Sequence, residues 1–260
     1  MRLKKLVVIF IRIFPIFIFK LKYEKYMKTL KEYINESLLD DFDDIEKSQD
    51  NRQEVIQFLE DNYHAFKFID LFDIFEISDK PNKKGFYEVK YLNKNLECAV
   101  TNYDLEHLTN GLFIFTSGKF CIRNQHKLKD IMGFSEKFNG SIGLYGLSNL
   151  KTLKGLPKKI TRGDLKIVSC NNLKTLEGCP TEVGGDFMLI SNESLENLKG
   201  SPRIIKGICD ICDNKLLNPL IGTPKEVKRF LIRGIRKKDL NITPQDIENV
   251  CKADVVIVRD

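Results

Sequence analysis

The sequence has little of what catalysis requires. Its three histidines, His64, His107 and His126, are far apart and have no recognisable catalytic partners, which favours surface or packing roles over general-base chemistry. The glycine pair within residues 182–187 lacks the Lys-Ser/Thr of a phosphate-binding loop and belongs to a repeat turn. We therefore predict that the protein is not an enzyme and has no catalytic residue, small-molecule substrate or cofactor.

An ordered cysteine framework is also missing. The seven cysteines are an odd number, are scattered along the chain, and in three cases occupy positions of a repeat described below. This pattern favours reduced structural thiols over disulfides. Cys209 and Cys212 have the only spacing typical of metal ligands, but a zinc site usually needs four ligands and no second pair is present. We predict no metal site, and metal or redox use of this pair is the alternative.

Excess positive charge is absent outside the segment 1–26. Residues 1–26 hold seven Lys and Arg against Glu24, a net charge of +6 that equals that of the whole chain, so residues 27–260 sum to zero. Because phosphate-driven affinity needs a concentrated basic surface, nucleic acid is not an expected partner. Residues 40–61 are locally acidic and residues 225–238 locally basic. The basic run is typical of a solvated end of the molecule, with an anionic partner as the alternative.

What the sequence does have is an internal period. Five glycines recur at a nearly constant step of twenty-two or twenty-three positions, with an apolar framework in step around them: Gly133, Gly155, Gly178, Gly200 and Gly222. A repeat of this length cannot bury its apolar face alone, so successive units must stack into a continuous core. The period therefore predicts a solenoid.

Each unit opens with two alternating apolar residues, as a strand with one buried face requires. These pairs are Phe120/Ile122, Ile142/Leu144, Leu165/Ile167, Phe187/Leu189 and Cys209/Ile211. Eight residues after the first member of each pair comes a leucine, at Leu128, Leu150, Leu173, Leu195 and Leu217. We expect these leucines to be buried in one column beneath a ribbon of parallel strands.

The segments 164–180 and 186–202 resemble leucine-rich repeats, with Cys170, Asn192 and Asn214 in the Asn/Cys position after the strand. The resemblance covers about residues 118–232 and implies a β-rich α/β solenoid of about five units, each one period long. The leucine expected two residues after the Asn/Cys position comes three residues after it here. A parallel β-solenoid of another type is therefore the alternative.

The two ends of the solenoid are predicted to carry caps, because an open end invites aggregation. We expect a small α+β cap over residues 51–117, with a helix near residues 51–63, a turn at residues 81–85, and a hairpin between residues 86–92 and 96–103. We expect a helix–strand cap over residues 233–260. There, Thr243 would be the N-cap and Pro244 the first residue of a helix running to about Val250, before a final strand over residues 253–260.

The segment 1–26 is a basic, hydrophobic leader. Residues 6–19 are an apolar stretch behind a basic start, the layout of a secretory signal or a membrane anchor. Arg12 and Pro15 interrupt it, and it is shorter than the ~20 residues of a spanning helix. Membrane contact is therefore expected only through residues 1–26, and an over-extended gene start is the alternative.

Residues 27–50 read as an amphipathic helix followed by an acidic linker. Met27–Ser37 resembles the capsid-targeting leader of internal head proteins in large contractile-tailed phages. In that family the maturation protease cuts after a glutamate that has Ile or Leu two residues before it, and Ile34 and Glu36 match. The resemblance implies cleavage that releases Ser37, although the family's leader begins the protein and this one starts only at Met27. An ordinary first helix is the alternative.

The strand pattern also predicts an outward face with two side-chain columns. One column is Arg123, Tyr145, Val168, Ile190 and Cys212, and its neighbour is Cys121, Gly143, Lys166, Met188 and Asp210. An exposed apolar patch often marks a partner site, so we predict a partner-binding face made of Tyr145, Lys166, Val168, Met188 and Ile190. The alternative is that this patch lies under a cap or simply tolerates exposure.

These observations predict a non-enzymatic module that binds a protein partner of unknown identity. The resemblance of Met27–Ser37 implies a phage virion or internal head protein, located in the virion or the host cytoplasm. The alternative is a bacterial leucine-rich-repeat protein that is membrane-anchored or secreted through residues 6–19.

Overall fold

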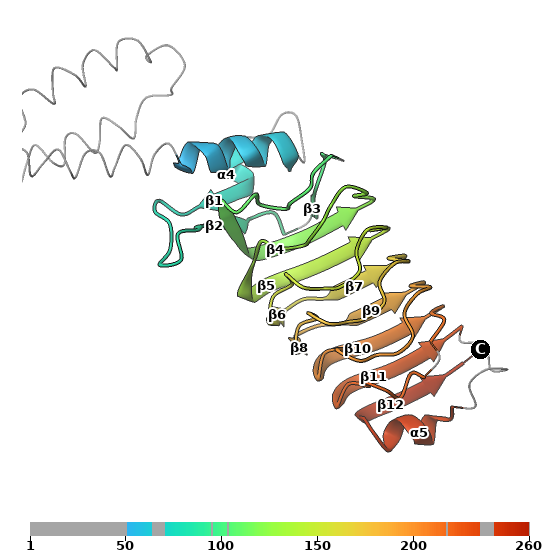
Figure 1. The fold of residues 1–260 in the computed structure, drawn as a ribbon. Coiled ribbons are helices and arrows are strands. Elements are labelled where there is room, and N and C mark those ends of the chain that lie inside the picture. Colours follow the sequence, from blue (N-terminus) through green and yellow to red (C-terminus); the bar gives the residue numbers. More distant parts are fainter. Residues whose placement is uncertain are drawn as a thin grey trace, which may run out of the picture. The chain divides into compact units, whose positions relative to one another are not determined.

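The strands lie side by side and succeed one another down the molecule (Figure 1). The computed structural model describes residues 51–63, 71–94, 96–102, 104–216, 218–234 and 242–259, and this part of the chain holds one sheet of 12 strands. The strands are β1 (Phe75–Ile77), β2 (Tyr87–Tyr91), β3 (Cys98–Ala99), β4 (Phe113–Arg123), β5 (Phe134–Tyr145), β6 (Lys159–Arg162), β7 (Leu165–Val168), β8 (Glu182–Val183), β9 (Phe187–Ile190), β10 (Ile204–Cys212), β11 (Glu226–Arg233) and β12 (Lys252–Val258). Residues 51–62 are helical, and two short helices follow, α4 (Leu71–Ile74) and α5 (Pro244–Glu248).

The sheet is the wall of a parallel β-solenoid of about seven turns with little helix. Each turn pairs in parallel with the next. The successive turns contain β4, then β5, then β6 and β7 together, then β8 and β9 together, then β10, β11 and β12. In the outer turns one long strand bends in its middle, whereas in the two central turns the bend separates two shorter strands. The predicted solenoid with a parallel sheet is confirmed.

Apolar residues of the strands stack in register inside the solenoid. Phe120 pairs with Ile142, and the same position continues through Leu165, Phe187 and Cys209. All five are buried. A constant period and parallel pairing place equivalent residues of successive turns next to one another, so each turn covers the apolar face of the one before.

The predicted leucine column is buried as expected where the structure describes it. Leu128, Leu150, Leu173 and Leu195 are all buried. Leu217 lies outside the described residues. Strand register and leucine burial together confirm the predicted core.

A second column of glycines, which the sequence analysis did not single out, lies at the bend of five successive turns. Its members, Gly118, Gly140, Gly163, Gly185 and Gly207, recur with the same period as the first set. Gly118 and Gly140 are directly paired, and a methyl group on Gly140 would lie 1.7 Å from the Gly118 carbonyl oxygen. Successive backbones therefore approach more closely here than any side chain allows. The repeated step was the signal that could have revealed this column.

Buried polar groups link the turns just after the strands. The backbone N–H of Cys170 donates to Asn192 Oδ1 at 2.9 Å, and the backbone N–H of Asn192 donates to Asn214 Oδ1 at 2.9 Å. Asn192 Nδ2 also donates to the carbonyls of Ile167 and Ile190, at 3.1 and 3.0 Å. The predicted Asn/Cys position is thus a buried hydrogen-bonded ladder, which satisfies backbone groups that leave the sheet.

The predicted helix near residues 51–63 is present and covers the first turns. Its apolar residues Val55 and Leu59 are buried. The Tyr63 hydroxyl donates to the Leu108 carbonyl at 2.5 Å, and the Tyr63 ring lies edge-on to Phe115 with centroids 5.3 Å apart.

The predicted hairpin between residues 86–92 and 96–103 is wrong. β2 and β3 both pair in parallel with β4, with Tyr87 opposite Phe113 and Cys98 opposite Phe120. The long edge of β4 offers enough unpaired backbone for both segments, so they form a further part-turn of the solenoid. The hairpin in this region joins β1 and β2, which are antiparallel, through the predicted turn at residues 81–85.

The C-terminal region is also a turn of the solenoid rather than a separate cap. β12 pairs in parallel with β11, with Val256 opposite Phe230. The predicted helix start is confirmed, since Thr243 is the N-cap of α5 and forms a reciprocal capping box with Asp246. The spacing from β11 to β12 exceeds the period because α5 lies in the connection, which hid this turn from the sequence pattern. The structure therefore has about seven turns where the sequence predicted five, and it contains little helix, with few short helices near the ends.

Candidate functional site

The two predicted outward columns are aligned in register across the sheet. Arg123 pairs with Tyr145, and the column continues through Val168, Ile190 and Cys212. The neighbouring column runs through Cys121, Gly143, Lys166, Met188 and Asp210. Adjacent members stand about 4.8 Å apart, the spacing of paired strands. We call this surface the outward face.

The centre of the outward face is half-buried rather than fully exposed. Tyr145, Lys166, Val168, Met188 and Ile190 all have intermediate exposure. Side chains in one column lie close enough to shield each other's flanks, so only their tips meet solvent. The structure brings all five predicted residues together on one face, and their role in partner binding stays a prediction.

The end of the outward face nearest the N-terminal turns is charged and closely packed. The Arg123 guanidinium lies over the Tyr145 ring, 4.2 Å from its centroid, and Arg123 Nε donates to Cys121 Sγ at 2.6 Å. Glu97 lies 3.4 Å from Arg123 and 3.6 Å from Lys119. Burial raises the pKa of the Cys121 thiol, while Arg123 partly opposes that rise. A raised pKa favours the protonated thiol at neutral pH.

The opposite end of the outward face is also ion-paired. Arg233 binds both carboxylate oxygens of the buried Asp210, with Nε 3.3 Å from Oδ1. Beside them, the Cys212 thiol donates to Asp213 Oδ2 at 3.1 Å, and burial first, then Asp213, raises the pKa of that thiol to about 11. The face thus has an apolar centre between two ionic ends.

The remaining candidate groups are not brought together. Cys209 points into the core and Cys212 points outward, so the pair does not share one site. Within the described ranges, no group of three or more His, Cys, Asp or Glu side chains could hold a metal ion. His107 Nδ1 lies 2.8 Å from Asp130 Oδ2, and His126 Nδ1 lies 3.0 Å from Ser148 Oγ, each a contact between successive turns.

Several predicted features lie outside the described residues. These are His64, the apolar stretch at residues 6–19, the acidic linker up to residue 50, and the predicted cleavage site at Ile34, Glu36 and Ser37. Of the basic run at residues 225–238, residues 225–234 are described. In the described part of the chain, no helix has the length and hydropathy of a membrane span.

Comparisons with protein-family models, with curated proteins and with solved structures found no match to this chain. The structure itself shows a parallel β-solenoid repeat protein. The leucine-rich-repeat and phage-leader resemblances stay predictions.

Proposed function

We propose that this protein is a non-enzymatic solenoid that binds a protein partner through the outward face. The observation that carries this proposal is the registered pair of side-chain columns, with the apolar residues Val168, Met188 and Ile190 at their centre. A regular parallel sheet holds these side chains on a rigid surface, so little conformational entropy is lost when a partner docks.

The distribution of polarity on the outward face supports a protein partner. Protein interfaces commonly have an apolar centre surrounded by polar groups that fix the orientation of the partner. Here the centre lies between the Arg123–Glu97 pair at one end and the Arg233–Asp210 pair at the other. Tyr145, held by Arg123, would supply an aromatic contact of the kind enriched at interface hot spots.

A photo-crosslinking experiment tests this proposal. A benzoylphenylalanine replacing Met188 in the full chain should crosslink a partner in extracts of the source cells, and mass spectrometry identifies it. The double variant Tyr145→Glu, Ile190→Glu should lose that crosslink because two charges at the apolar centre oppose docking. The control variant Lys174→Glu, Lys199→Glu changes exposed residues of the loops and should keep it. An unchanged crosslink in the Tyr145→Glu, Ile190→Glu variant, with the fold intact by circular dichroism, would reject the outward face.

Within this class we propose a phage virion or internal head protein, packaged through residues 27–36. The pattern at Ile34 and Glu36 supports this assignment. The second candidate, a membrane-anchored or secreted leucine-rich-repeat protein, is favoured by the apolar stretch at residues 6–19. The intact mass of the native protein separates them: a chain that begins at Ser37 supports packaging, and one that retains the leader or is cleaved near Phe19 supports export.

A further inference from the structure

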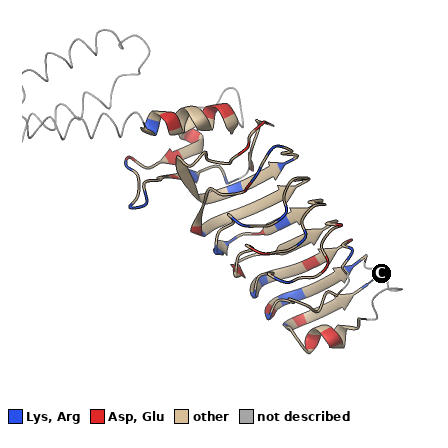
Figure 2. Cartoon of the chain, viewed as in Figure 1, with Lys and Arg blue, Asp and Glu red and all other residues tan. Residues whose placement is uncertain are grey.

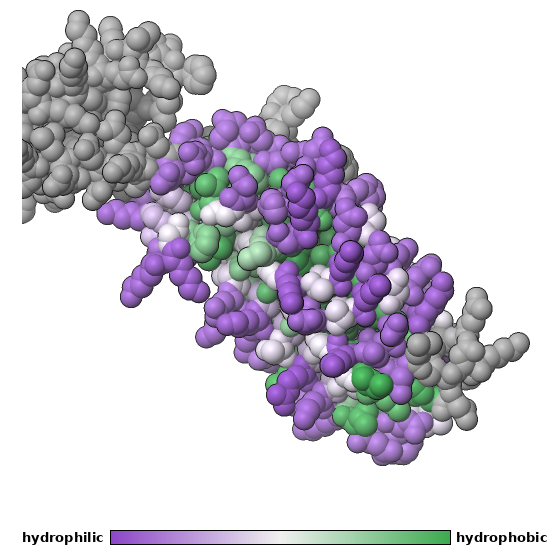
Figure 3. Space-filling view, in the orientation of Figure 1, coloured by the Kyte–Doolittle hydropathy of each residue, from purple (hydrophilic) through white to green (hydrophobic). Residues whose placement is uncertain are grey.

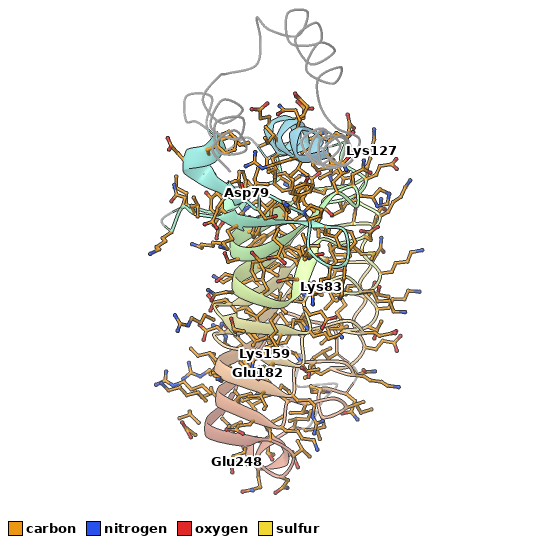
Figure 4. The ribbon with its side chains drawn as sticks, turned by 90° about the vertical axis from the view of Figure 1, so that its left-hand side faces the viewer. Asp79, Lys83, Lys127, Lys159, Glu182 and Glu248 are labelled. Atoms are coloured by element: carbon orange, nitrogen blue, oxygen red, sulfur yellow. The ribbon has the colours of Figure 1, made fainter. Side chains whose placement is uncertain are left out.

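Basic residues gather where β6, β8, β10 and β11 begin, and two of those in the earlier turns have carboxylate partners. Lys158 Nζ lies 3.3 Å from Glu136 Oε1, and Lys159 Nζ lies 2.6 Å from Glu182 Oε2. Figure 4 shows Lys159 and Glu182 next to one another on neighbouring strands. These ion pairs balance part of the positive charge of the earlier turns.

The next two turns place basic residues beside one another. The backbone N–H of Lys225 donates to the Arg203 carbonyl at 2.9 Å, so these two residues are neighbours in successive turns. Ile205 of β10 pairs with Val227 of β11, so the residues that follow them, Lys206 and Lys228, are neighbours as well. Like charges opposite one another on neighbouring strands repel and destabilise a sheet.

We call Arg203, Lys206, Lys225, Lys228 and Arg229 the basic corner. All five residues are exposed, and Figure 2 shows Lys and Arg at the ends of β10 and β11 that form it. Among the described carboxylates, Glu182 comes within ion-pair distance of the corner, 3.3 Å from Lys206, and Lys159 shares it. The other four cations have no ion-pair partner within the described residues, so the corner presents unbalanced positive charge.

We propose that the basic corner binds an acidic peptide segment of a protein partner. Its cations occupy two turns spaced about 4.8 Å apart, and an extended peptide presents side chains to one side about every 6.6 Å, so alternate carboxylates can reach both turns. Arg and Lys donate charge-assisted hydrogen bonds to carboxylates. Binding would relieve the repulsion between the neighbouring cations. The basic corner is separate from the outward face, so either surface can fail its test without the other.

A single-stranded nucleic acid fits the basic corner less well than an acidic peptide. Sequence-tolerant binding of single strands uses aromatic side chains on which bases stack. Phe72, the aromatic side chain that the described residues leave exposed, belongs to α4 and not to this corner.

Fluorescence anisotropy with the full-length protein and a fluorescein-labelled octaglutamate peptide tests the proposal at about 50 mM salt, where screening is weak. The wild-type protein should bind the peptide, and binding should weaken steeply by about 300 mM salt. The double variant Arg203→Glu, Lys228→Glu should weaken peptide affinity at least about tenfold because it reverses two of the converging charges. If this variant misfolds, the neutral variant Lys225→Gln, Arg229→Gln should show a loss in the same direction.

A matched control separates the basic corner from general attraction to lysine. Lys151 and Lys174 are exposed and occupy equivalent places in successive turns, and Lys151→Glu, Lys174→Glu makes the same change in net charge as the corner double variant. This control should keep the wild-type peptide affinity within about twofold, because two surface lysines contribute little by themselves. Equal loss in both double variants, or no binding by the wild-type protein, would overturn the proposal. A labelled oligothymidylate of twelve nucleotides that bound more tightly than the peptide, and lost affinity in the corner variant, would overturn it in favour of nucleic acid.

Discussion

The buried side chain of Asn192 forms hydrogen bonds with the backbone of two neighbouring turns. Its Oδ1 accepts from the backbone of Cys170, and its Nδ2 donates to the carbonyls of Ile167 and Ile190. The Ile190 carbonyl also accepts from the backbone N–H of Ser169 in the neighbouring turn, at 3.0 Å. A residue with both a donor and an acceptor is therefore needed at this buried position.

Replacing Asn192 with alanine should lower the free energy of unfolding by about 3 kcal/mol, because the Cys170 N–H and the Ile167 carbonyl both lose a buried hydrogen-bond partner. Urea denaturation monitored by circular dichroism measures this change. Asn171→Ala, at an exposed position of the preceding turn, is the control and should change stability by less than about 0.5 kcal/mol. Equal effects of the two substitutions would show that the ladder does not stabilise the fold.

Glu182, the first residue of β8, makes the stability of the protein dependent on pH. The hydrogen bond from Lys159 is the main cause that holds the pKa of this carboxyl below its ordinary value of 4.5, and Lys206 adds to it. Since the pKa is depressed in the folded state, the stabilising contribution is fully present above the ordinary value and is lost as the pH falls through the folded-state pKa. We expect Glu182→Gln to be less stable than the wild-type protein at about pH 7, with the difference shrinking by about pH 3. A difference in unfolding free energy that is independent of pH would contradict this ion-pair account.

At the scale of elements, the strands depend on the bend between their two halves. β4 and β5 continue through the bend as single strands, with Gly118 opposite Gly140 at its centre. Gly140 has φ of 157° and lies against the backbone of the neighbouring turn. The close approach, more than the backbone angle, excludes a side chain at this position.

Gly140→Ala should therefore destabilise the protein by more than about 3 kcal/mol, because the added methyl group forces two paired strands apart. Gly85→Ala is the matched control, since Gly85 also has positive φ, 83°, but has open space around it. It should cost only the backbone penalty of about 1–2 kcal/mol. Thermal unfolding of both variants measures the difference in stability. Similar losses of stability in the two variants would show that the close contact at the bend does not cause the destabilisation.

At the scale of the whole described unit, each turn contacts mainly the turns next to it. The N-terminal turns are covered by the helix at residues 51–62, whereas β12 is the last strand of the pairing order. Figure 3 shows apolar surface near that end, and Val250 and Val255 are exposed. Hydrophilic side chains cover most of the remaining surface in this view. Stability in such an array is roughly a sum of turns and of the interfaces between them.

A core substitution in a central turn should therefore have a local effect on hydrogen exchange. Leu173→Ala removes a fully buried side chain and should cost about 3 kcal/mol. We expect amide protection to fall most in β7, which belongs to this turn, and in β9 of the next turn, and least in β1 and β2. Hydrogen-exchange mass spectrometry maps this pattern. A uniform loss of protection along the chain would instead show that the described unit unfolds as one cooperative block.

Periodicity was enough to predict the solenoid, its parallel sheet, its core columns and the two columns of the outward face. These features repeat in five successive turns, so five copies of one pattern give a stronger signal than a single copy could. The helix start at Thr243 and Pro244 could also be predicted from the sequence, because a helix cap is determined by neighbouring residues. The bend glycines, from Gly118 to Gly207, recur with the same period, so they too can be predicted from the sequence.

Only the tertiary structure decided which strands pair, because pairing depends on which strand edges are free. β2 and β3 had the pattern of a hairpin, but the free edge of β4 accepted both in parallel. β12 likewise joined β11 across a connection too long for the period to reveal. The basic corner arose in the same way: Arg203 and Lys225 are a full period apart in the chain, and only the stacking of turns makes their charges neighbours. Local patterns define which face of a strand is apolar, while pairing and charge proximity depend on contacts between distant residues.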